Sequence, residues 1–489
     1  MMIITLYTSR VILSTLGVED YGIFSVVGGV VVMLSFISNS LSVATQRFLN
    51  YEMGLDNKDK VKEIFSTALT IHIFIAFIIV IIAETAGLWF VKNYLVIPAE
   101  RMIAAIWVFH FSVALMFVII VTTPYNALII ANEKMSVYAW VSIIDAILKL
   151  IIVFILQAVS YDKLVVYGLL LLIVTVLTNG TYMIYCRKKF LEIEFVLKWK
   201  KEHVKKLMKF SGWMFAGTSA DILSGQGVNM LINIFFGPVF NAARGIAFQV
   251  QAGFYSLISN IMLVSKPQIV KSYSQKDFSY MYKLIFISAK ISFILLYFIS
   301  LPVLFQTDYI LHLWLKEVPE YTVIFIQLIL IDMLIQSSFM SLGSVSQASG
   351  KIRNYQIIVS ISYLLTFCIT ALLFKFSNFP VYSTFIISII ISIIAFLARL
   401  FELKKAIIFP VRNFLSQVTV RLLLTTIISI ILPLLFLEIT NIESSFLNFC
   451  IVTVLCFISV IAAAWFIGFS KFEKDFFEQK IRSFIKTRK

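Results

Sequence analysis

The chain is dominated by fourteen apolar runs, most of them long enough to cross a lipid bilayer as an α-helix. A helix needs about 20 mainly apolar residues to span ~30 Å of hydrocarbon. The runs lie near residues 1–16, 21–46, 65–88, 103–121, 138–160, 164–186, 210–235, 243–265, 284–305, 321–343, 357–374, 382–400, 418–438 and 446–468. Because lipid offers the backbone no hydrogen-bond partner, each run must be helical. We therefore predict an all-α polytopic membrane protein with about 14 transmembrane helices.

The composition excludes a soluble protein. Of 489 residues, 60% are hydrophobic and 14% are charged, whereas soluble domains average roughly 45–50% and 25%. The net charge of +15 indicates basic flanks on the cytoplasmic side of the membrane rather than nucleic-acid binding. The four cysteines lie in or beside apolar runs without a CxxC pair, so we expect neither a disulfide framework nor a metal site.

The basic residues predict the topology. With the N-terminus in the cytoplasm, 32 Lys and Arg residues fall on the inner side and six on the outer side. Since inner loops carry the excess of positive charge, we predict an inner-membrane-type protein with both termini in the cytoplasm. All loops are short, and the longest hydrophilic segment is the basic stretch 187–209.

An internal repeat predicts two lobes of six helices each. Shifting the sequence by 221 residues aligns 36–68 with 257–289 at nine identical positions, including Asp56 with Asp277. Six helices separate the two copies, so the repeats are parallel, an arrangement found in transporters that bind substrate between their halves. We predict an N-terminal lobe (1–186), a basic cytoplasmic linker (187–209), a C-terminal lobe (210–400) and two further helices with a basic tail (401–489).

Polar residues at helical spacing mark four of the spans. Those considered for the substrate site are Tyr7, Arg10, Asn39, Arg47, Asn229, Asn233, Arg244, Gln251 and Tyr255, and Asp221 is considered for coupling. They fall on the first two spans of each predicted lobe. Residues spaced three or four apart share a helix face, so the four stripes predict one water-filled, net-cationic cavity between the lobes.

A packing role is the alternative for many of these positions. Small and polar residues in spans often serve helix association, and that interpretation suits the Ser and Gly positions best. A central arginine costs ~2.5–3.5 kcal/mol on insertion, which favours a cavity position for Arg10. Arg47 and Arg244 lie near span ends, so their side chains could instead reach the interface.

Other charges within the spans have simpler explanations. Asp145 and Lys149 are four residues apart and can neutralise one another on one helix. We expect Lys290 to reach the cytoplasmic headgroups. Asp332 has no evident explanation, and a proton or cation role stays open for it.

Catalytic signals are absent from the sequence. Gly350-Lys351 lacks the glycine and the Ser/Thr that a phosphate-binding loop requires, because the corresponding residues are Val345 and Ile352. No outer loop is large enough to hold the catalytic groups of a membrane glycosyltransferase. We therefore expect a protein that is not an enzyme and uses no cofactor.

Three sequence motifs resemble those of a known family. They are Leu6-Tyr7-Thr8-Ser9-Arg10, Leu16-Gly17-Val18-Glu19-Asp20-Tyr21-Gly22, and Pro124-Tyr125-Asn126-Ala127 with Ala131-Asn132-Glu133-Lys134-Met135. They resemble bacterial O-antigen and capsule flippases, the polysaccharide transporters of the multidrug/oligosaccharidyl-lipid/polysaccharide exporter superfamily. The helix count and the repeat extend this resemblance over essentially the whole chain.

The resemblance implies a V-shaped pair of lobes that alternates between inward and outward openings. The implied substrate is a polyprenyl-pyrophosphate-linked oligosaccharide, moved to the periplasmic leaflet, with glycosyltransferases and a polymerase of the same pathway as partners. In the related peptidoglycan-precursor flippases, arginines on the first, second and eighth helices line the cavity. The matching positions by helix and depth are Arg10, Arg47 and Arg244.

Two other classes of function remain open at this stage. A cation-coupled multidrug exporter of the same superfamily would favour an acidic or aromatic cavity, which the arginines oppose. A membrane glycosyltransferase or a non-transporting scaffold is opposed by the short outer loops and by the polar stripes.

The topology can be tested with a reporter fused after Lys489. We expect a fused phosphatase, which needs the periplasm, to be inactive and a fused fluorescent protein, which folds in the cytoplasm, to be bright. The opposite pair of results would show that the predicted orientation is wrong.

Overall fold

The computed structural model describes residues 35–95, 97–190, 199–236, 238–314, 318–376, 379–407, 409–440, 446–471 and 473–475, with a few isolated positions before residue 35. The described residues are helical with short connections, and they contain no strand. The chain divides into two compact units, Met1–Thr218 and Ser219–Lys489. Each unit is described by itself below.

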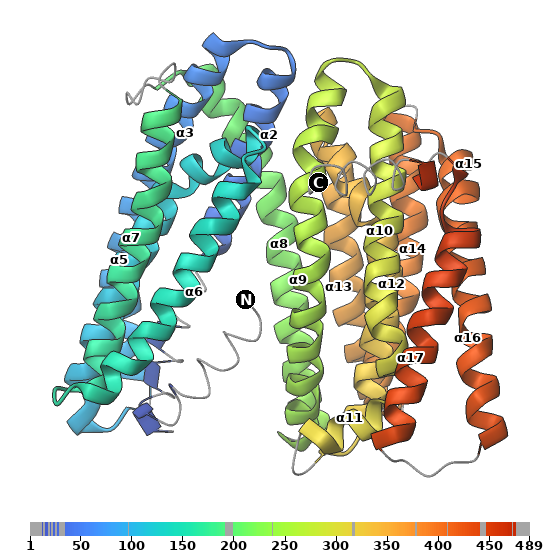
Figure 1. Cartoon of the computed structure of the whole chain (residues 1–489). Helices are drawn as coiled ribbons and strands as arrows, with labels where there is room; N and C mark the ends of the chain where they lie inside the picture. The colour runs from blue at the N-terminus through green and yellow to red at the C-terminus, as the bar shows by residue number, and fades with distance from the viewer. Residues whose placement is uncertain are drawn as a thin grey trace, which may run out of the picture. The chain divides into compact units, whose positions relative to one another are not determined.

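Unit 1 is a bundle of long helices (Figure 1). Its elements are α2 (Ser35–Gly54), α3 (Lys58–Ile82), α4 (Leu88–Tyr94), α5 (Met102–Ala131), α6 (Met135–Ala158), α7 (Lys163–Lys189) and the first half of α8 (Lys201–Phe236). A π-helical turn at Ala83–Gly87 joins α3 to α4. The central helix α5 contacts α2, α3, α6 and α7, and most residues of its second half are buried.

Unit 2 repeats this pattern and extends it. After the second half of α8 it contains α9 (Pro238–Ser274), α10 (Phe278–Phe305), α11 (Thr307–Trp314), α12 (Thr322–Ser349), α13 (Arg353–Phe376), α14 (Ser383–Ile407), α15 (Val411–Phe414), α16 (Val420–Thr440) and α17 (Phe446–Ala463). A π-helical turn at Leu415–Thr419 joins α15 to α16. The central helix is α12, which contacts α9, α10 and α14.

The predicted spans are helical wherever the structure describes them. Eleven described helices are long and apolar enough to cross a membrane. The helix α2 begins at Ser35, within the predicted span 21–46, and α8 covers the predicted span 210–235 and carries a polar stripe. The predicted span 1–16 lies outside the described residues, apart from a few positions. The prediction of an all-α membrane protein with about 14 helices is confirmed.

The internal repeat is visible in the helix contacts. In unit 1, α2 contacts α3 and α5, α3 contacts α5, and α7 contacts α5 and α6. In unit 2, α9 contacts α10 and α12, α10 contacts α12, and α14 contacts α12 and α13. These contacts correspond one to one when α2, α3, α5, α6 and α7 are matched with α9, α10, α12, α13 and α14.

The repeated turn corrects the register of the sequence alignment. In the α2–α3 turn, Asn57 N–H donates to the Glu52 carbonyl and Asp56 has a φ of +53°. In the α9–α10 turn, Asp277 N–H donates to the Ser272 carbonyl, and Lys276 has a φ of +62°. Asn57 and Asp277 are also the N-caps of the following helices. The structural offset is thus 220 residues, one fewer than the identities suggested, because hydrogen bonding and not residue identity defines the turn.

A buried ion pair within unit 2 joins α10 to the segment that follows α17. Lys290 on α10 donates to both carboxylate oxygens of Glu473 at 2.8 and 3.0 Å, and these side chains are 2% and 5% exposed. The backbone N–H and hydroxyl of Ser470 also donate to Glu473. Lys290 therefore binds the segment that follows α17, and the expectation that it reaches lipid headgroups is wrong.

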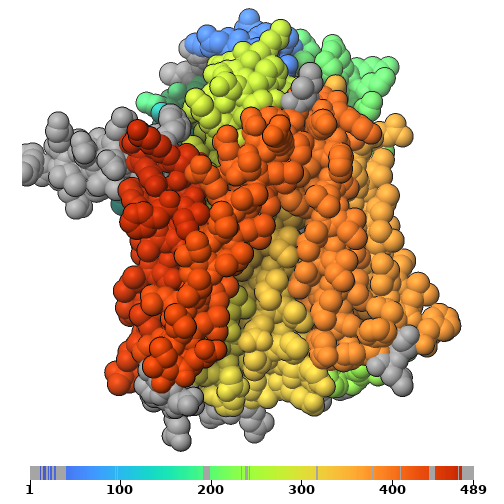
Figure 2. All heavy atoms as spheres, turned by 90° about the vertical axis from the view of Figure 1, so that its right-hand side faces the viewer, coloured from blue at the N-terminus to red at the C-terminus, as the bar shows by residue number. Residues whose placement is uncertain are grey.

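Figure 2 shows the furrow that separates α16 and α17 from α13 and α14 on this face of unit 2.

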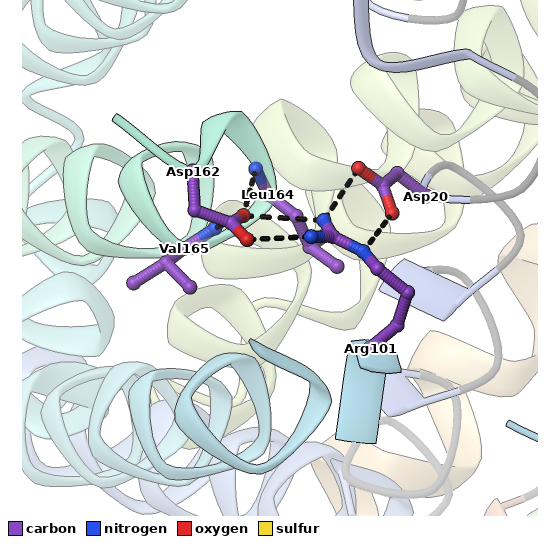
Figure 3. Close-up of polar contacts among 5 residues, drawn as sticks. All are labelled: Asp20, Arg101, Asp162, Leu164 and Val165. Carbon is purple, nitrogen blue, oxygen red and sulfur yellow. Dashed lines mark hydrogen bonds and ion pairs between the residues drawn. The ribbon is translucent and has the colours of Figure 1, made fainter. Parts of the chain in front are cut away.

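The arginine Arg101 binds two carboxylates at one end of unit 1 (Figure 3). Its Nε and Nη2 donate to Asp20 at 2.8 and 2.6 Å, and its Nη1 and Nη2 donate to Asp162 at 2.6 and 3.2 Å. Such two-pronged pairs are among the stronger polar contacts in proteins. The start of α5, the N-cap of α7 and the segment that contains Asp20 are joined in this way. Asp20 belongs to one of the family-like motifs, so part of that motif has a structural role.

One local prediction about charges is confirmed. Lys149 donates to Asp145 at 2.7 Å, one turn apart on α6. The pair neutralises two charges on a helix whose neighbouring surface is otherwise apolar.

Replacing Arg101 should weaken unit 1. We expect Arg101→Ala to lower the free energy of unfolding by roughly 1–2 kcal/mol, because charge-assisted hydrogen bonds contribute more than neutral ones but partial exposure screens them. Arg101→Lys should recover only part of the lost free energy of unfolding, because an ammonium group lacks the planar fork of a guanidinium. The unfolding temperature in detergent measures this, with Lys92→Ala, at an exposed lysine, as the control. Equal values for Arg101→Ala and the control would contradict the proposed contribution.

The stability contributed by the ion pair between Asp162 and Arg101 should decrease at low pH. Burial alone would raise the pKa of Asp162, but hydrogen bonds from Arg101 and from the N–H groups of Val165 and Leu164 hold it below its ordinary value. A carboxyl with a depressed pKa in the folded state stabilises fully above its ordinary pKa of about 3.9 and loses this contribution as the pH falls through the lower value. We expect Asp162→Asn, which keeps a good N-cap, to lower the unfolding temperature at pH 7. At pH 3 the difference from the wild type should be smaller, and a constant difference would exclude the ionic contribution.

Candidate functional site

Unit 2 contains a cavity of about 590 Å³ among its described helices. Its walls come from α8, α9, α12, α13 and α14. Cavities of 300–1,000 Å³ with a few converging polar groups commonly hold small ligands. Both charge signs are present on these walls, in the side chains of Asp221, Arg244, Asp332 and Arg399.

The close approach of α8 and α13 forms one wall. The Ser224 hydroxyl donates to the backbone carbonyl of Tyr363 at 2.7 Å. Three residues later, a Cβ on Gly227 would lie 2.6 Å from the Phe367 ring. Only glycine permits this approach without moving the ring. Asp221, one turn before Ser224, is thereby placed on the cavity wall.

The guanidinium of Arg244 is buried and incompletely satisfied. Its residue is 7% exposed, and its Cζ lies 4.7 Å from the centre of the Phe248 ring. Its Nη1 is buried without a hydrogen-bond partner among the described residues. No described carboxylate forms an ion pair with it. Buried polar groups are almost always hydrogen-bonded, so this donor is suited to an acceptor that enters the cavity.

The carboxylate of Asp332 supplies a buried acceptor to the same cavity. It is 6% exposed, and its Oδ2 accepts hydrogen bonds from Gln336 at 2.9 Å and from Ser388 at 3.0 Å. Its Oδ1 is buried and has no partner among the described residues. Two bonds fix the orientation of the carboxylate, and one oxygen is left to accept from a ligand or from water.

The second cavity arginine, Arg399, lies on α14. Its Cζ is 5.1 Å from the centre of the Phe339 ring and 5.5 Å from that of Tyr355. Its Nε is buried with no hydrogen-bond partner among the described residues. A smaller cavity of about 60 Å³ adjoins it, lined by the hydroxyl groups of Ser362, Thr366, Ser388 and Ser392 among others. This space is polar and large enough for water.

The structure brings together four of the residues that the sequence singled out. Asp221, Arg244, Gln251 and Tyr255 all line the 590 Å³ cavity. Asn229 is not among its lining residues, and it accepts from the Asn241 side-chain amide through both its carbonyl groups at 2.8 Å. Asn229 therefore ties α8 to α9.

The remaining predicted residues belong to unit 1 or lie outside the description. Arg47 is 8% exposed, and its Cζ lies 4.5 Å from the centre of Phe48 and 4.9 Å from that of Tyr51. Tyr7 and Arg10 lie outside the described residues. The same holds for the side chains of Asn39 and Asn233, which sit within described helices.

Two cavity residues were not assigned to a site from the sequence. Asp332 was noticed without an explanation, although its spacing of four from Gln336 was the available signal. Arg399 stands at the end of the apolar run 382–400, where a basic residue is typical of a cytoplasmic flank. The helix α14 continues to Ile407, and this places Arg399 two turns inside it.

Comparisons with known proteins agree with this architecture. The family model described as polysaccharide biosynthesis protein matches residues 2–275. No curated protein matches the chain in a sequence search.

Solved structures with the same fold are transporters. A MATE structure in the straight conformation aligns with a TM-score of 0.70 at 14% identity, over 83% of this chain and 93% of that one. A MOP superfamily transporter from Pyrococcus furiosus, whose binding pocket of reversed polarity suggests a different function, aligns with 0.70 at 13% identity, over 84% and 93%. An outward-facing multidrug resistance MATE family transporter aligns with 0.64 at 15% identity, over 83% and 92%.

The family match covers more than half of the chain and includes all three motifs noted above. At 13–15% identity the solved structures establish the fold alone. The chain belongs to the polysaccharide biosynthesis protein family, and it has the fold of the MATE transporters of the MOP superfamily.

Proposed function

We propose that the protein moves a polyprenyl-pyrophosphate-linked oligosaccharide, a repeat unit of O-antigen, capsule or exopolysaccharide, across the bacterial inner membrane. The observation that carries this proposal is the polar cavity of unit 2. Its wall carries the buried guanidinium of Arg244, whose Nη1 has no hydrogen-bond partner among the described residues. The family described as polysaccharide biosynthesis protein supports the chemical class of the substrate.

The substrate explains why such a cavity is needed. A lipid pyrophosphate is multiply negative, and its sugars carry many hydroxyl groups, so neither part can cross hydrocarbon without replacing its hydration. The polyprenyl tail can remain in the bilayer. A transporter for this molecule therefore needs an enclosed polar path for the head and no polar path for the tail.

The arginines are proposed to bind the pyrophosphate. Guanidinium groups pair with phosphate oxygens through two parallel hydrogen bonds, which suits arginine better than lysine. Arg244 meets this requirement within the described residues, and Arg10 and Arg47 are assigned by the resemblance in helix and depth. Tyr7, Asn39, Asn229, Asn233, Gln251 and Tyr255 are assigned to the substrate path.

Transport is proposed to be driven by an ion gradient or the membrane potential. One charge that moves through 100 mV supplies ~2.3 kcal/mol. Asp221 on the cavity wall is the carboxylate we assign to coupling. The proposed transporter alternates between inward and outward openings and is not an enzyme, and it receives its substrate from glycosyltransferases and delivers it to a polymerase.

A multidrug exporter is the second candidate. It is favoured by the two carboxyl groups of the cavity, Asp221 and Asp332, and by the aromatic residues Phe248, Tyr255 and Tyr363. Organic cations are attracted by both kinds of group. The buried Arg244 and the half-buried Arg399 oppose such a ligand, because they would repel a cation in the same space.

Complementation of a deletion strain tests the proposal. We expect the strain to accumulate lipid-linked oligosaccharide on the cytoplasmic leaflet and to lose surface polysaccharide. Arg244→Ala and Arg10→Ala should restore less than a tenth of the wild-type export, and the lysine variants should restore more, since charge is kept but the fork is lost.

The exposed Arg412 supplies the control variant Arg412→Ala, which should complement fully. Membrane abundance of every variant separates loss of transport from loss of protein. A deletion strain with normal surface polysaccharide and increased sensitivity to cationic drugs would favour the multidrug exporter instead.

A further inference from the structure

Ring contacts fix the relative heights of the cavity residues. Near the start of α9 and α12, Phe240 lies 5.5 Å from Tyr321, measured between ring centres. Near the start of α14, Phe325 on α12 lies 4.8 Å from Phe385. These three helices begin at the same end of unit 2, so heights along them can be compared by counting residues from these contacts.

The two cavity arginines lie at different heights. The Arg244 guanidinium covers Phe248, which is eight residues beyond Phe240. The Arg399 guanidinium covers Phe339, which is eighteen residues beyond Tyr321. The difference of ten helical positions corresponds to about 15 Å at 1.5 Å per residue. Asp332 lies between them, about 10 Å in height from the Phe339 level by the same count.

This separation excludes a shared pyrophosphate. The two phosphorus atoms of a pyrophosphate are joined through one oxygen, so the group is only a few ångströms long and cannot reach both guanidinium groups. The carboxyl groups of Asp332 and Asp221 also line the space, and they oppose a second anion near Arg399 through like-charge repulsion. At most the Arg244 end is suited to the pyrophosphate.

The rest of the cavity is complementary to hydroxyl groups. A hydroxyl both donates and accepts, and among the described residues the Nε donor of Arg399 and the Oδ1 acceptor of Asp332 have no hydrogen-bond partner. Gln251, Thr366 and Ser388 add neutral partners of both kinds. A site with buried groups that require hydroxyl partners discriminates strongly, because a ligand without them leaves those groups unsatisfied.

We propose that the stretch of the unit 2 cavity from Asp332 to Arg399 binds the oligosaccharide as an extended chain, and that these two residues select for the glycan rather than for the pyrophosphate. This inference rests on the proposed function. It assigns a specificity role to two residues that no sequence motif places in a site.

Binding of two lipids tests it. The full-length protein in lipid nanodiscs is titrated with polyprenyl pyrophosphate that carries no sugar, and with the lipid-linked oligosaccharide pool extracted from the native cells. We expect the wild type to bind the glycan-bearing lipid more tightly. Asp332→Asn and Arg399→Gln should each weaken binding of that lipid about tenfold and change binding of the sugar-free lipid less than twofold. Arg244→Gln should weaken both.

Controls keep structural damage apart from specificity. Arg399→Lys retains the charge and should recover part of the affinity, and Arg412→Gln, at an exposed arginine of α15, should match the wild type. Each variant must show the wild-type unfolding temperature within two degrees, and a variant that fails this criterion is replaced by the milder Arg399→Lys or Asp332→Glu.

Four results would overturn the inference. If Arg399→Gln weakened the binding of both lipids equally, Arg399 would be a phosphate ligand. Unchanged affinity for both lipids, together with a loss of sodium or proton dependence of transport in Asp332→Asn, would make Asp332 a coupling residue instead. A wild type that transports the glycan-bearing lipid but binds both lipids equally would reject the glycan site alone, whereas a wild type that neither binds nor transports either lipid would reject the proposed function with it.

Discussion

The bilayer gives a buried charge no partner except the protein itself, and the contact between Lys290 and Glu473 meets this constraint. The pairs of Arg101 with Asp20 and Asp162, and of Lys149 with Asp145, are partly exposed but are satisfied in the same way within one unit. Removal of one partner of a buried ion pair leaves an uncompensated charge, and this destabilises the fold more than replacing both partners with apolar residues. These contacts therefore hold fixed parts of each unit together and are poor candidates for groups that bind a passing substrate.

The cavity of unit 2 departs from this rule in a limited way. Within the part of the chain that the structure describes, Arg244 and Arg399 each keep one buried donor without a partner, and Asp332 keeps one such acceptor. Aromatic rings support both guanidinium groups, and Ser388 and Gln336 orient the carboxylate. The result is a set of groups held in place but left open on one side, which is the condition for binding a ligand without first rearranging the site.

The sequence was sufficient for the local features and insufficient for the contacts between distant segments. Apolar run length predicted the helices, and a spacing of four predicted the Asp145–Lys149 pair. Nothing local indicates that Lys290 pairs with Glu473, 183 residues away, so burial in lipid headgroups was the natural expectation. Arg399 was misassigned for a related reason: the apolar run ends before the helix does, because polar residues can continue a helix on the side that faces a cavity.

The repeat shows which features belong to the fold and which belong to one unit. The turn offset of 220 matches Lys290 with Thr70, an uncharged residue whose hydroxyl donates to the Ser66 carbonyl of its own helix. The turns that follow α5 and α12 each contain one residue in the left-handed conformation, Glu133 after α5 and Gly350 after α12. Their offset of 217 matches Asp332 with the apolar Leu115. The two units thus share helices and turns while the charges differ, so specificity in this fold depends on a few side chains placed on a repeated backbone.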